Sequence, residues 1–373
     1  MTSPRAGTLR ITASRFFDGD TMHGPTAVVI EDGTVTGIEP CAADEAEHHL
    51  LVPGLVDAQM NGWDSVEVAG ADAGSMETLG ALLAREGTTH WLGTVITDSL
   101  GRLTDRLGQL DAIVSRGTTG AVGIHVEGPF LGRATGAHPR EHVVPISQEW
   151  IASLPPSVRM VTMGAELDGF AQAARQLVQA GVVVAIGHSR PDARQFDAAV
   201  EAGSTMVTHL FNAMSGVHHR EDGLALSALT DPRVRVGLIA DMAHVSPAAV
   251  RLAFLAKPHD VALVSDSVAW NGRWASARGV TVTDGAPRLP DGTLAGSSTS
   301  LLGCVRNVVS RCGVDISTAL RAATSTPARL IGRDDIGCIR VGQRFSAVSL
   351  TPDLGVSGVW RGLQSSRGNS THR

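Results

Sequence analysis

The chain has 373 residues, of which 43% are apolar and 18% charged, and its formal net charge at pH 7 is −6. This composition excludes a disordered chain and predicts two domains, or one large barrel with an accessory part. Lys257 is the one lysine, and tyrosine is absent. Most enzymes that use a lysine Schiff base, a Walker lysine or a tyrosine acid are therefore excluded.

The sequence also limits the partners and the location of the protein. It has no basic run, which favours a small molecule over a nucleic acid as the partner. It has no signal-peptide core and no stretch of about 18 apolar residues, so we expect a cytoplasmic protein that binds no membrane. The cysteines form no C-x-x-C pair, and we interpret them as reduced packing residues. They are Cys41, Cys304, Cys312 and Cys338.

In chain order, the first elements are short apolar runs separated by turn residues, at 8–14, 26–30 and 34–38, which is typical of a small β-structure. From residue 53 onward the apolar runs alternate with longer stretches of helical periodicity, as they do in βαβ units. Eight such runs lie at residues 55–60, 89–96, 121–126, 159–164, 182–186, 205–209, 234–240 and 261–265.

Eight strands that alternate with helices over about 270 residues indicate a closed eight-stranded (β/α) barrel of the TIM type rather than an open sheet. Two more helical stretches follow at 300–312 and 315–331, and strand-like runs return at 347–350 and 356–360. We predict an α/β fold in which residues 53–331 form the barrel. Residues 1–52 and 332–373 are predicted to form a small β-domain from both ends of the chain.

Polar residues follow several of the predicted strands, at the end where barrels of this type place their active sites. Glu127, His188 and His209 offer one carboxylate and two imidazoles from three non-adjacent strands. This ligand set suits a catalytic Zn²⁺ or Fe²⁺ with one or two positions left for water. Asp266 follows the eighth strand and is placed to take a proton from that water.

Each of these residues also has a simpler interpretation. A single histidine at a strand end is more often a hydrogen-bonded structural residue than a ligand, and it is the combination that favours a metal centre. Gln59 and Asn61 fit turn chemistry as well as a place near the site. Asp57 is expected beside the site, His125 packed behind the barrel, and Lys257 on the surface.

The ordered set of strand-end segments resembles the N-acetylglucosamine-6-phosphate deacetylases of the amidohydrolase superfamily over nearly the whole chain. The segments are PGLVDAQMNG at 53–62, HVEGPFL at 125–131, GHS at 187–189, THLFNAM at 208–214, SD at 265–266, LAGS at 294–297 and ATSTPA at 323–328. The resemblance implies that Glu127, His188 and His209 bind a divalent metal ion, and that Asp266 acts first as general base and then as general acid.

The resemblance also implies a single metal ion per subunit. Many members of the superfamily carry His-x-His after the first strand, where this chain has Gln59 and Asn61, and neither amide is a strong zinc ligand. Relatives with two metals bridge them through a carbamylated lysine on the fourth strand, but residues 159–166 contain no lysine. We therefore expect one ion, zinc in the first place and iron as the alternative.

Further residues are assigned to the substrate by the resemblance, and for His138, His244 and Arg220 the alternative is a solvated loop residue. His138 is implied near the acetyl carbonyl and His244 near a sugar hydroxyl. Asn212 and Ala213 are implied to hold the phosphate of an amino sugar phosphate. Arg220 is implied to reach the site of a neighbouring subunit, which predicts a homodimer.

One departure from the family pattern leaves the sugar open. After Asp266 the chain carries Trp270 and Trp274 in a segment that is short for the family, and these rings are able to narrow the pocket. The leading hypothesis is deacetylation of N-acetylglucosamine 6-phosphate. The alternatives are N-acetylgalactosamine 6-phosphate or an unphosphorylated conjugate as the substrate, and a non-catalytic regulator that binds sugar phosphates.

Overall fold

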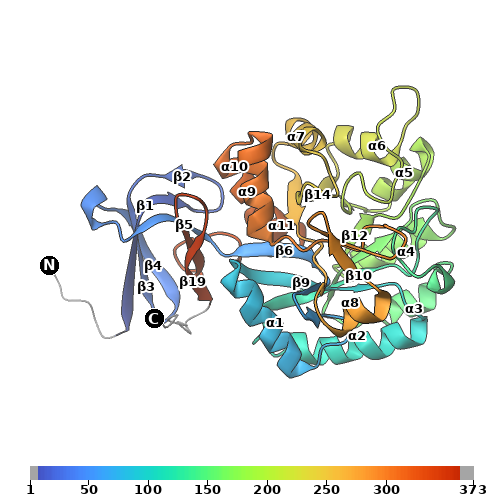
Figure 1. The fold of residues 1–373 in the computed structure, drawn as a ribbon, viewed down its shortest axis with the longest axis horizontal. Helices are drawn as coiled ribbons and strands as arrows, with labels where there is room; N and C mark the ends of the chain where they lie inside the picture. The colour runs from blue at the N-terminus through green and yellow to red at the C-terminus, as the bar shows by residue number, and fades with distance from the viewer. Residues whose placement is uncertain (1–6, 362–373) are drawn as a thin grey trace.

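The fold was derived from a computed structural model, which describes residues 7–361. Strands from both ends of this range form one sheet, seen at the left of Figure 1 where the blue and red strands lie together. The sheet has the order β19-β18-β5-β1-β3-β4, with β2 paired to β1. The predicted small β-domain built from both ends of the chain is therefore confirmed. Its strands are β1 (Thr8–Phe17), β2 (Met22–His23), β3 (Thr26–Glu31), β4 (Thr34–Pro40), β5 (His48–Pro53), β18 (Ser346–Leu350) and β19 (Val356–Arg361).

Strand β5 is the central member of this sheet. It runs parallel to β1 and antiparallel to β18, so it joins the first part of the chain to the last. Alternate apolar side chains such as Ile11, Val28 and Phe345 are buried in a core of their own, as expected for half-buried strands. The predicted domain limits at 52 and 332 stay a prediction, although β5 ends at Pro53 and the next strand begins at Leu55.

The second sheet contains eight parallel strands within the described residues, in the order β15-β14-β13-β12-β11-β10-β9-β6. It curls so that its two edge strands meet, where the backbone N–H of Asp266 donates to the carbonyl of Gln59 at 3.0 Å. The predicted β/α barrel is confirmed. Its strands are β6 (Leu55–Met60), β9 (Thr88–Ile96), β10 (Ala121–Glu127), β11 (Val158–Met163), β12 (Val183–Ile186), β13 (Met206–Val207), β14 (Arg235–Ile239) and β15 (Val261–Val264).

Helices surround the barrel on its outer face (Figure 1). In α2 the residues Leu103, Leu107 and Leu110 recur at helical spacing and are buried against the strands. None of the helices within residues 7–361 is long and apolar enough to cross a membrane. The helices are α1 (Ala73–Arg85), α2 (Leu100–Val114), α3 (Gln148–Ala152), α4 (Phe170–Gln179), α5 (Ala193–Glu201), α6 (Leu224–Thr230), α7 (Pro247–Ala256), α8 (Arg273–Arg278), α9 (Leu301–Cys312), α10 (Ile316–Ala323) and α11 (Ser325–Leu330).

Small elements decorate the loops between strands and helices. The hairpin of β7 (Gly62–Trp63) and β8 (Val66–Glu67) follows the first barrel strand, and the hairpin of β16 (Thr281–Thr283) and β17 (Ala286–Arg288) follows α8. Short 3-10 turns lie at η1 (Ala43–Glu45) and η2 (Arg140–His142). Both hairpins are inserted after a barrel strand, so they lie at the end of the barrel that carries the polar strand ends.

Three expectations about the elements need correction. The helix predicted over 315–331 is divided into α10 and α11, because Thr324 adopts φ −130° and ψ −90° and its hydroxyl donates to the carbonyl of Leu320. Strand β13 covers two residues rather than five, so His209 lies beyond it. The segment after Asp266 contains a helix and a hairpin of its own instead of a simple shortened loop.

Lys257 was expected on the surface, and this prediction is wrong. It follows α7, its side chain is only 4% exposed, and its ammonium group donates to the carbonyls of Asp231 and Val234. Burial lowers the pKa of Lys257, against the opposing charge of Asp260. The long stem lets the ammonium cross the space between two loops and satisfy both carbonyls. All four cysteines are unpaired thiols, as predicted.

Asp57 lies at the seam where the barrel closes. Its carboxylate accepts hydrogen bonds from the backbone N–H groups of Ser265, across the seam, and of Gln59. The side chain is 1% exposed, and burial raises its pKa to about 6 even though these hydrogen bonds favour the charged form. The seam therefore contains a carboxylate that is costly to ionise.

We predict that Lys257→Met lowers the free energy of unfolding by about 2 kcal/mol, because the carbonyls of Asp231 and Val234 lose their donor. Urea denaturation measures this change. Arg194→Met, on the exposed side of α5, is the matched control and should change stability by less than about 0.5 kcal/mol. Equal effects of the two substitutions would show that the buried ammonium does not contribute to stability.

We predict that Asp57→Asn stabilises the fold at pH 7 by about 2 kcal/mol. The pKa of Asp57 is about 6 in the folded chain, which is higher than its ordinary 3.8. The folded state therefore favours the protonated carboxyl group. This contribution to stability is full below pH 4 and is lost as the pH rises through 6. The asparagine keeps an acceptor for both N–H groups without the charge. Unfolding at several pH values tests this, and a gain that does not shrink toward pH 4 would contradict it.

Candidate active site

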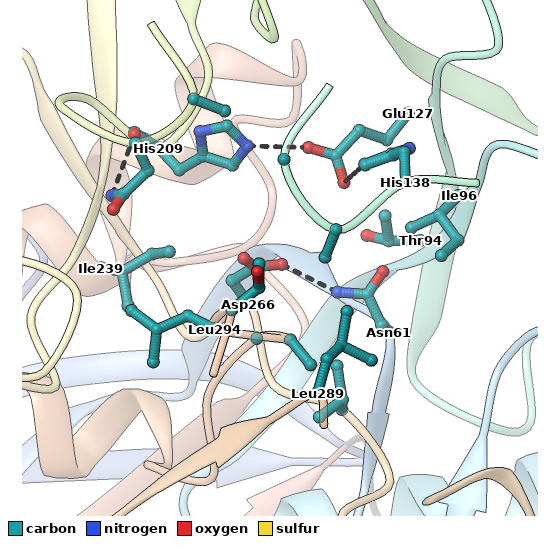
Figure 2. A pocket seen from close by; sticks show the side chains of 18 of the residues that line it. Asn61, Thr94, Ile96, Glu127, His138, His209, Ile239, Asp266, Leu289 and Leu294 are labelled. Carbon is teal, nitrogen blue, oxygen red and sulfur yellow. Dashed lines mark hydrogen bonds and ion pairs between the residues drawn. The ribbon is translucent and has the colours of Figure 1, made fainter. Parts of the chain in front are cut away.

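The predicted site residues gather at the carboxyl ends of the barrel strands, around a cavity of about 250 Å³ (Figure 2). Glu127 is the last residue of β10, and His188, His209 and Asp266 each lie two residues beyond β12, β13 and β15. Parallel strands bring such positions to one rim of the barrel. Nine predicted site residues line the cavity: Asn61, Glu127, His138, His188, His209, Asn212, Ala213, His244 and Asp266.

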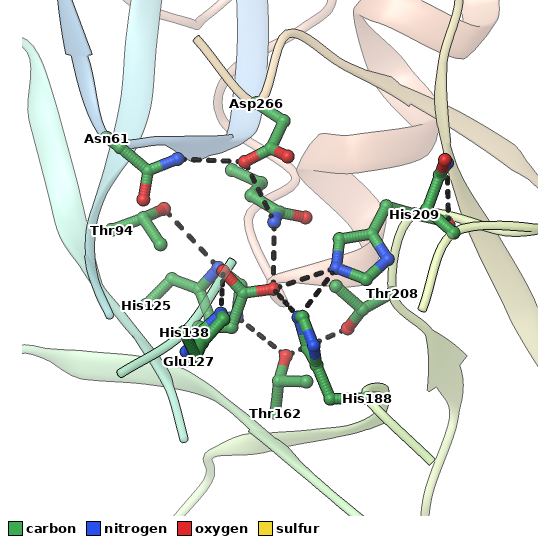
Figure 3. Close-up of polar contacts among 12 residues, drawn as sticks. Asn61, Thr94, His125, Glu127, His138, Thr162, His188, Thr208, His209 and Asp266 are labelled. Atoms are coloured by element: carbon green, nitrogen blue, oxygen red, sulfur yellow. Dashed lines mark hydrogen bonds and ion pairs between the residues drawn. The ribbon is translucent and has the colours of Figure 1, made fainter. Parts of the chain in front are cut away.

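Three side chains converge on one point of this cavity (Figure 3). The Oε1 atom of Glu127 lies 3.2 Å from Nε2 of His188 and 3.0 Å from Nε2 of His209, and the two nitrogens are 3.1 Å apart. Ligand atoms around a tetrahedral ion with bonds of about 2.1 Å are separated by about 3.4 Å. The three atoms are therefore spaced almost as they would be around a divalent metal ion.

The chemistry of these donors also fits a metal ion. The Nδ1 atom of His188 lies 3.0 Å from the carbonyl of Ala134, which is an acceptor, so the proton of a neutral ring sits on Nδ1 and Nε2 presents a lone pair. That lone pair faces the carboxylate of Glu127. A cation between the two atoms would remove the repulsion between the lone pair of His188 and the carboxylate of Glu127. A backbone carbonyl that accepts the other ring N–H is also usual for metal-bound histidine.

His138 lies next to the same cluster. Its ring centroid is 4.3 Å from that of His188, its Nε2 is 3.9 Å from Oε2 of Glu127, and its Nδ1 pairs with the hydroxyl of Thr97 at 2.7 Å. Glu127, His138 and His188 also have ligand atoms within 4.8 Å of one another. Burial and then the neighbouring His188 keep the pKa of His138 well below its usual value. His138 is therefore a neutral ring at the edge of this cluster.

Asp266 faces the cluster and is held by two amides. Its Oδ1 accepts hydrogen bonds from Nδ2 of Asn61 at 2.8 Å and from Nε2 of Gln59 at 3.1 Å. The same Gln59 nitrogen also donates to Glu127 at 3.1 Å. Burial, and then the negative charge of Glu127, raise the pKa of Asp266 to about 7. A carboxyl group with this pKa exchanges a proton readily at neutral pH.

The backbone is strained at three of these positions. His188, His209 and Asp266 have φ values of 50°, 31° and 46°, in the left-handed region that side chains with a Cβ rarely adopt. Such strain costs of order 1 kcal/mol per residue and persists where the surrounding structure enforces it. The turns after β12, β13 and β15 thus direct side chains into the cavity at the expense of local backbone energy.

The other predicted substrate residues differ in their places. His244 lines the cavity, and its Nδ1 pairs with Asp241 at 2.7 Å. Burial raises the pKa of Asp241, but hydrogen bonds from His244 and the backbone outweigh this and leave it low. Asn212 and Ala213 line the cavity in the loop after β13. Arg220 does not line it, and lies in an exposed loop.

His125 was predicted to lie behind the barrel, and this prediction is wrong. It stands two residues before Glu127, so the two side chains share one face of β10. His125 is fully buried inside the barrel, with its ring nitrogens 2.8 Å from the hydroxyl of Thr162 and 3.4 Å from that of Thr94. Thr162 continues this chain of hydrogen bonds to Thr208 at 2.8 Å. The cluster of Glu127, His188 and His209 therefore rests on a polar layer within the barrel (Figure 3).

Some residues that line the cavity were not singled out from the sequence. Glu67 and Arg278 lie on the hairpin of β7 and β8 and on α8, in inserted elements whose position no periodicity reveals. Of the two tryptophans noted after Asp266, Trp274 lines the cavity, and Arg278 lies over its ring at 5.2 Å. Trp270 is outside the cavity lining and packs edge-on against Trp63 at 4.6 Å.

Comparison with known proteins agrees with this geometry. The model of the amidohydrolase family matches residues 50–366. An N-acetylgalactosamine-6-phosphate deacetylase of Escherichia coli O157:H7 is 34% identical over 346 residues, covering 89% of this chain and 92% of the relative. An N-acetylglucosamine-6-phosphate deacetylase of Vibrio furnissii is 30% identical over 371 residues, covering 93% and 92% of the two chains.

A solved structure is similar over nearly the same span. It is a variant N-acetyl-D-glucosamine-6-phosphate deacetylase of Mycobacterium smegmatis in complex with N-acetyl-D-glucosamine-6-phosphate. It matches with a TM-score of 0.88 and 30% sequence identity, over 95% of this chain and 98% of that chain. The likeness includes both the barrel and the β-domain.

Proposed function

We propose that this chain, which belongs to the amidohydrolase family, is a hydrolase that removes the acetyl group from N-acetylglucosamine 6-phosphate and releases acetate and glucosamine 6-phosphate. The observation that carries the proposal is the convergence of Glu127, His188 and His209 on one point with Asp266 opposite. Relatives that cover about nine tenths of the chain are deacetylases of amino sugar phosphates, which supports this reaction and argues against a non-catalytic regulator.

In this proposal Glu127, His188 and His209 hold one divalent ion, zinc in the first place and iron as the alternative. When bound, the ion supplies a Lewis acid for the amide carbonyl and lowers the pKa of water. Gln59 and Asn61 are proposed to bind no second ion, because an amide is a weak zinc ligand, and their amide nitrogens donate to the carboxylates of Glu127 and Asp266. The lone lysine lies between Asp231 and Val234, so it forms no metal-bridging carbamate.

Asp266 carries the proton in the proposed reaction. The Oδ1 atom is fixed by the amides of Asn61 and Gln59, which leaves Oδ2 as the oxygen that takes a proton from the attacking water. The pKa of about 7 suits a group that must accept this proton and then give it to the leaving amine. Asp266 is thus general base in the first half of the reaction and general acid in the second.

The remaining residues are proposed to bind the substrate. His138 stands beside the metal ligands and is assigned to the acetyl carbonyl, and His244, oriented by Asp241, is assigned to a sugar hydroxyl. Asn212 and Ala213 are assigned to the phosphate. We also propose a cytoplasmic homodimer in which Arg220, exposed on its loop, reaches the phosphate in the neighbouring subunit.

Asp266→Asn is predicted to lower kcat by at least about a thousandfold, since proton transfer in both directions is lost. The variant should keep its metal, because Asp266 is not among the three ligands. Acetate release and elemental analysis on the same preparation measure both quantities. Asp105→Asn, exposed on α2, is the control. Substantial activity in Asp266→Asn would remove Asp266 from this role.

A second substrate deserves a direct comparison, because the Escherichia coli relative is an N-acetylgalactosamine-6-phosphate deacetylase. We predict the highest kcat/KM for N-acetylglucosamine 6-phosphate, lower activity on its galactosamine epimer, and at least a hundredfold loss without the phosphate. The panel consists of both hexosamines, each with and without phosphate. A preference for the galactosamine compound would reassign the substrate, and equal rates without phosphate would contradict the roles of Asn212, Ala213 and Arg220.

A further inference from the structure

A second, larger cleft lies at the opposite end of the barrel from the candidate active site. It has a volume of about 820 Å³ and is walled by the first residues of β9, β10 and β11, by the turns that precede them, and by residues of the β-domain. The site described above lies at the carboxyl ends of the same strands. The two cavities are therefore separated by the length of the barrel.

This cleft is rich in arginine. Four guanidinium groups line it together with one imidazole, and Asp111 is the one carboxylate among the lining residues of the described chain. The carboxylate of Asp111 accepts a hydrogen bond from the backbone of Ser157. The four arginines come from separate parts of the sequence, as does the imidazole of His90: Arg159, Arg333, Arg344 and Arg361.

The arginines keep unused donors. Arg159 is exposed, and its side chain makes no hydrogen bond or ion pair within residues 7–361. Arg344 donates to the carbonyl of Asp32, and Arg361 to the carbonyls of Thr118 and Thr119. These acceptors are uncharged, so they leave the positive charge in place. Each guanidinium has five N–H donors, which exceeds the bonds that these arginines make.

Glycines make room for two of these side chains. A Cβ on Gly123 would lie 2.3 Å from Cγ of Arg159, and a Cβ on Gly120 would lie 2.7 Å from Nη1 of Arg361. A side chain at either glycine would displace the arginine beside it. The backbone of β10 and its preceding turn therefore leaves room for the aliphatic stem of Arg159 and for the guanidinium group of Arg361.

The positive charge of the cleft affects the imidazole of His90, which lines it. Burial, and then the charges of Arg333 and Arg361, together lower the pKa of this imidazole to about 4. Arg333 is paired with Asp335 at 2.6 Å, whereas Arg159, Arg344 and Arg361 have no carboxylate partner in the described chain. Residues 1–6 and 362–373 contain no aspartate or glutamate in the sequence, so they add no acidic side chain.

We propose that this arginine cleft binds a phosphate-type oxyanion and thereby stabilises the junction of the barrel and the β-domain. A tetrahedral dianion matches the paired donors of guanidinium groups. Arg159 comes from the barrel and Arg344 from the segment next to β18, so one anion between them links the two parts. The inference does not depend on the reaction proposed above.

The first test is thermal unfolding of the metal-loaded protein during titration with inorganic phosphate, with sodium chloride balancing the ionic strength. We expect a saturable rise in the melting temperature, because a ligand that binds the folded state stabilises it. Arg159→Gln should raise the dissociation constant for phosphate by about tenfold, which is the effect of losing one charge-assisted hydrogen bond. It should leave kcat for acetate release unchanged, since the cleft lies away from Asp266.

Arg194→Gln, exposed on α5, is the matched control and should bind phosphate as the unchanged protein does. Arg344→Gln provides a second variant if Arg159→Gln does not fold. Crystals soaked in tungstate, which mimics phosphate and scatters anomalously, locate the anion. We expect a peak between Arg159 and Arg344. A peak confined to the cavity of Glu127, or equal dissociation constants for the Arg159 and Arg194 variants, would overturn the proposal.

Discussion

The candidate site depends on one buried carboxylate, that of Glu127. Burial alone would raise its pKa, but with the rings of His188 and His209 and the amide of Gln59 against it the pKa of Glu127 stays well below its usual value. A buried negative charge is stable only when positive charge or strong donors surround it. Three features of the site are arranged around this single charge. They are the approach of His188 and His209 to Glu127, the strained turns that direct both histidines, and the neutral ring of His138 beside them.

Gln59 explains how two carboxylates coexist in such a small space. Its amide nitrogen donates to Glu127 and to Asp266, both at 3.1 Å, and so it places a shared positive dipole between groups that repel each other. An imidazole at this position would instead offer a lone pair to a second cation. The amide therefore reduces the repulsion between the two acids, while burial and the charge of Glu127 still raise the pKa of Asp266 to about 7.

The sequence was most informative about features that depend on residues close together in the chain. The alternation of apolar runs and helical stretches predicted the barrel, and the position of Glu127 at a strand end predicted its place on the rim. Long-range packing was not accessible in this way. The ammonium of Lys257 reaches two carbonyls of another loop, and Arg278 approaches the cavity from an inserted helix. For His125 the sequence did hold the answer. His125 and Glu127 are two residues apart, and side chains at this spacing lie on the same face of a strand.

The β-domain sheet has a consequence for synthesis of the protein. Strand β5 receives its partner β18 only after some 290 further residues have been made, as the pairing of Val52 with Val348 shows. Until then, one edge of β5 presents unpaired backbone groups and the apolar residues Leu50 and Leu51. Exposed edges of this kind pair with other chains. The growing chain is thus open to misassembly from the synthesis of β5 until β18 and β19 have been made.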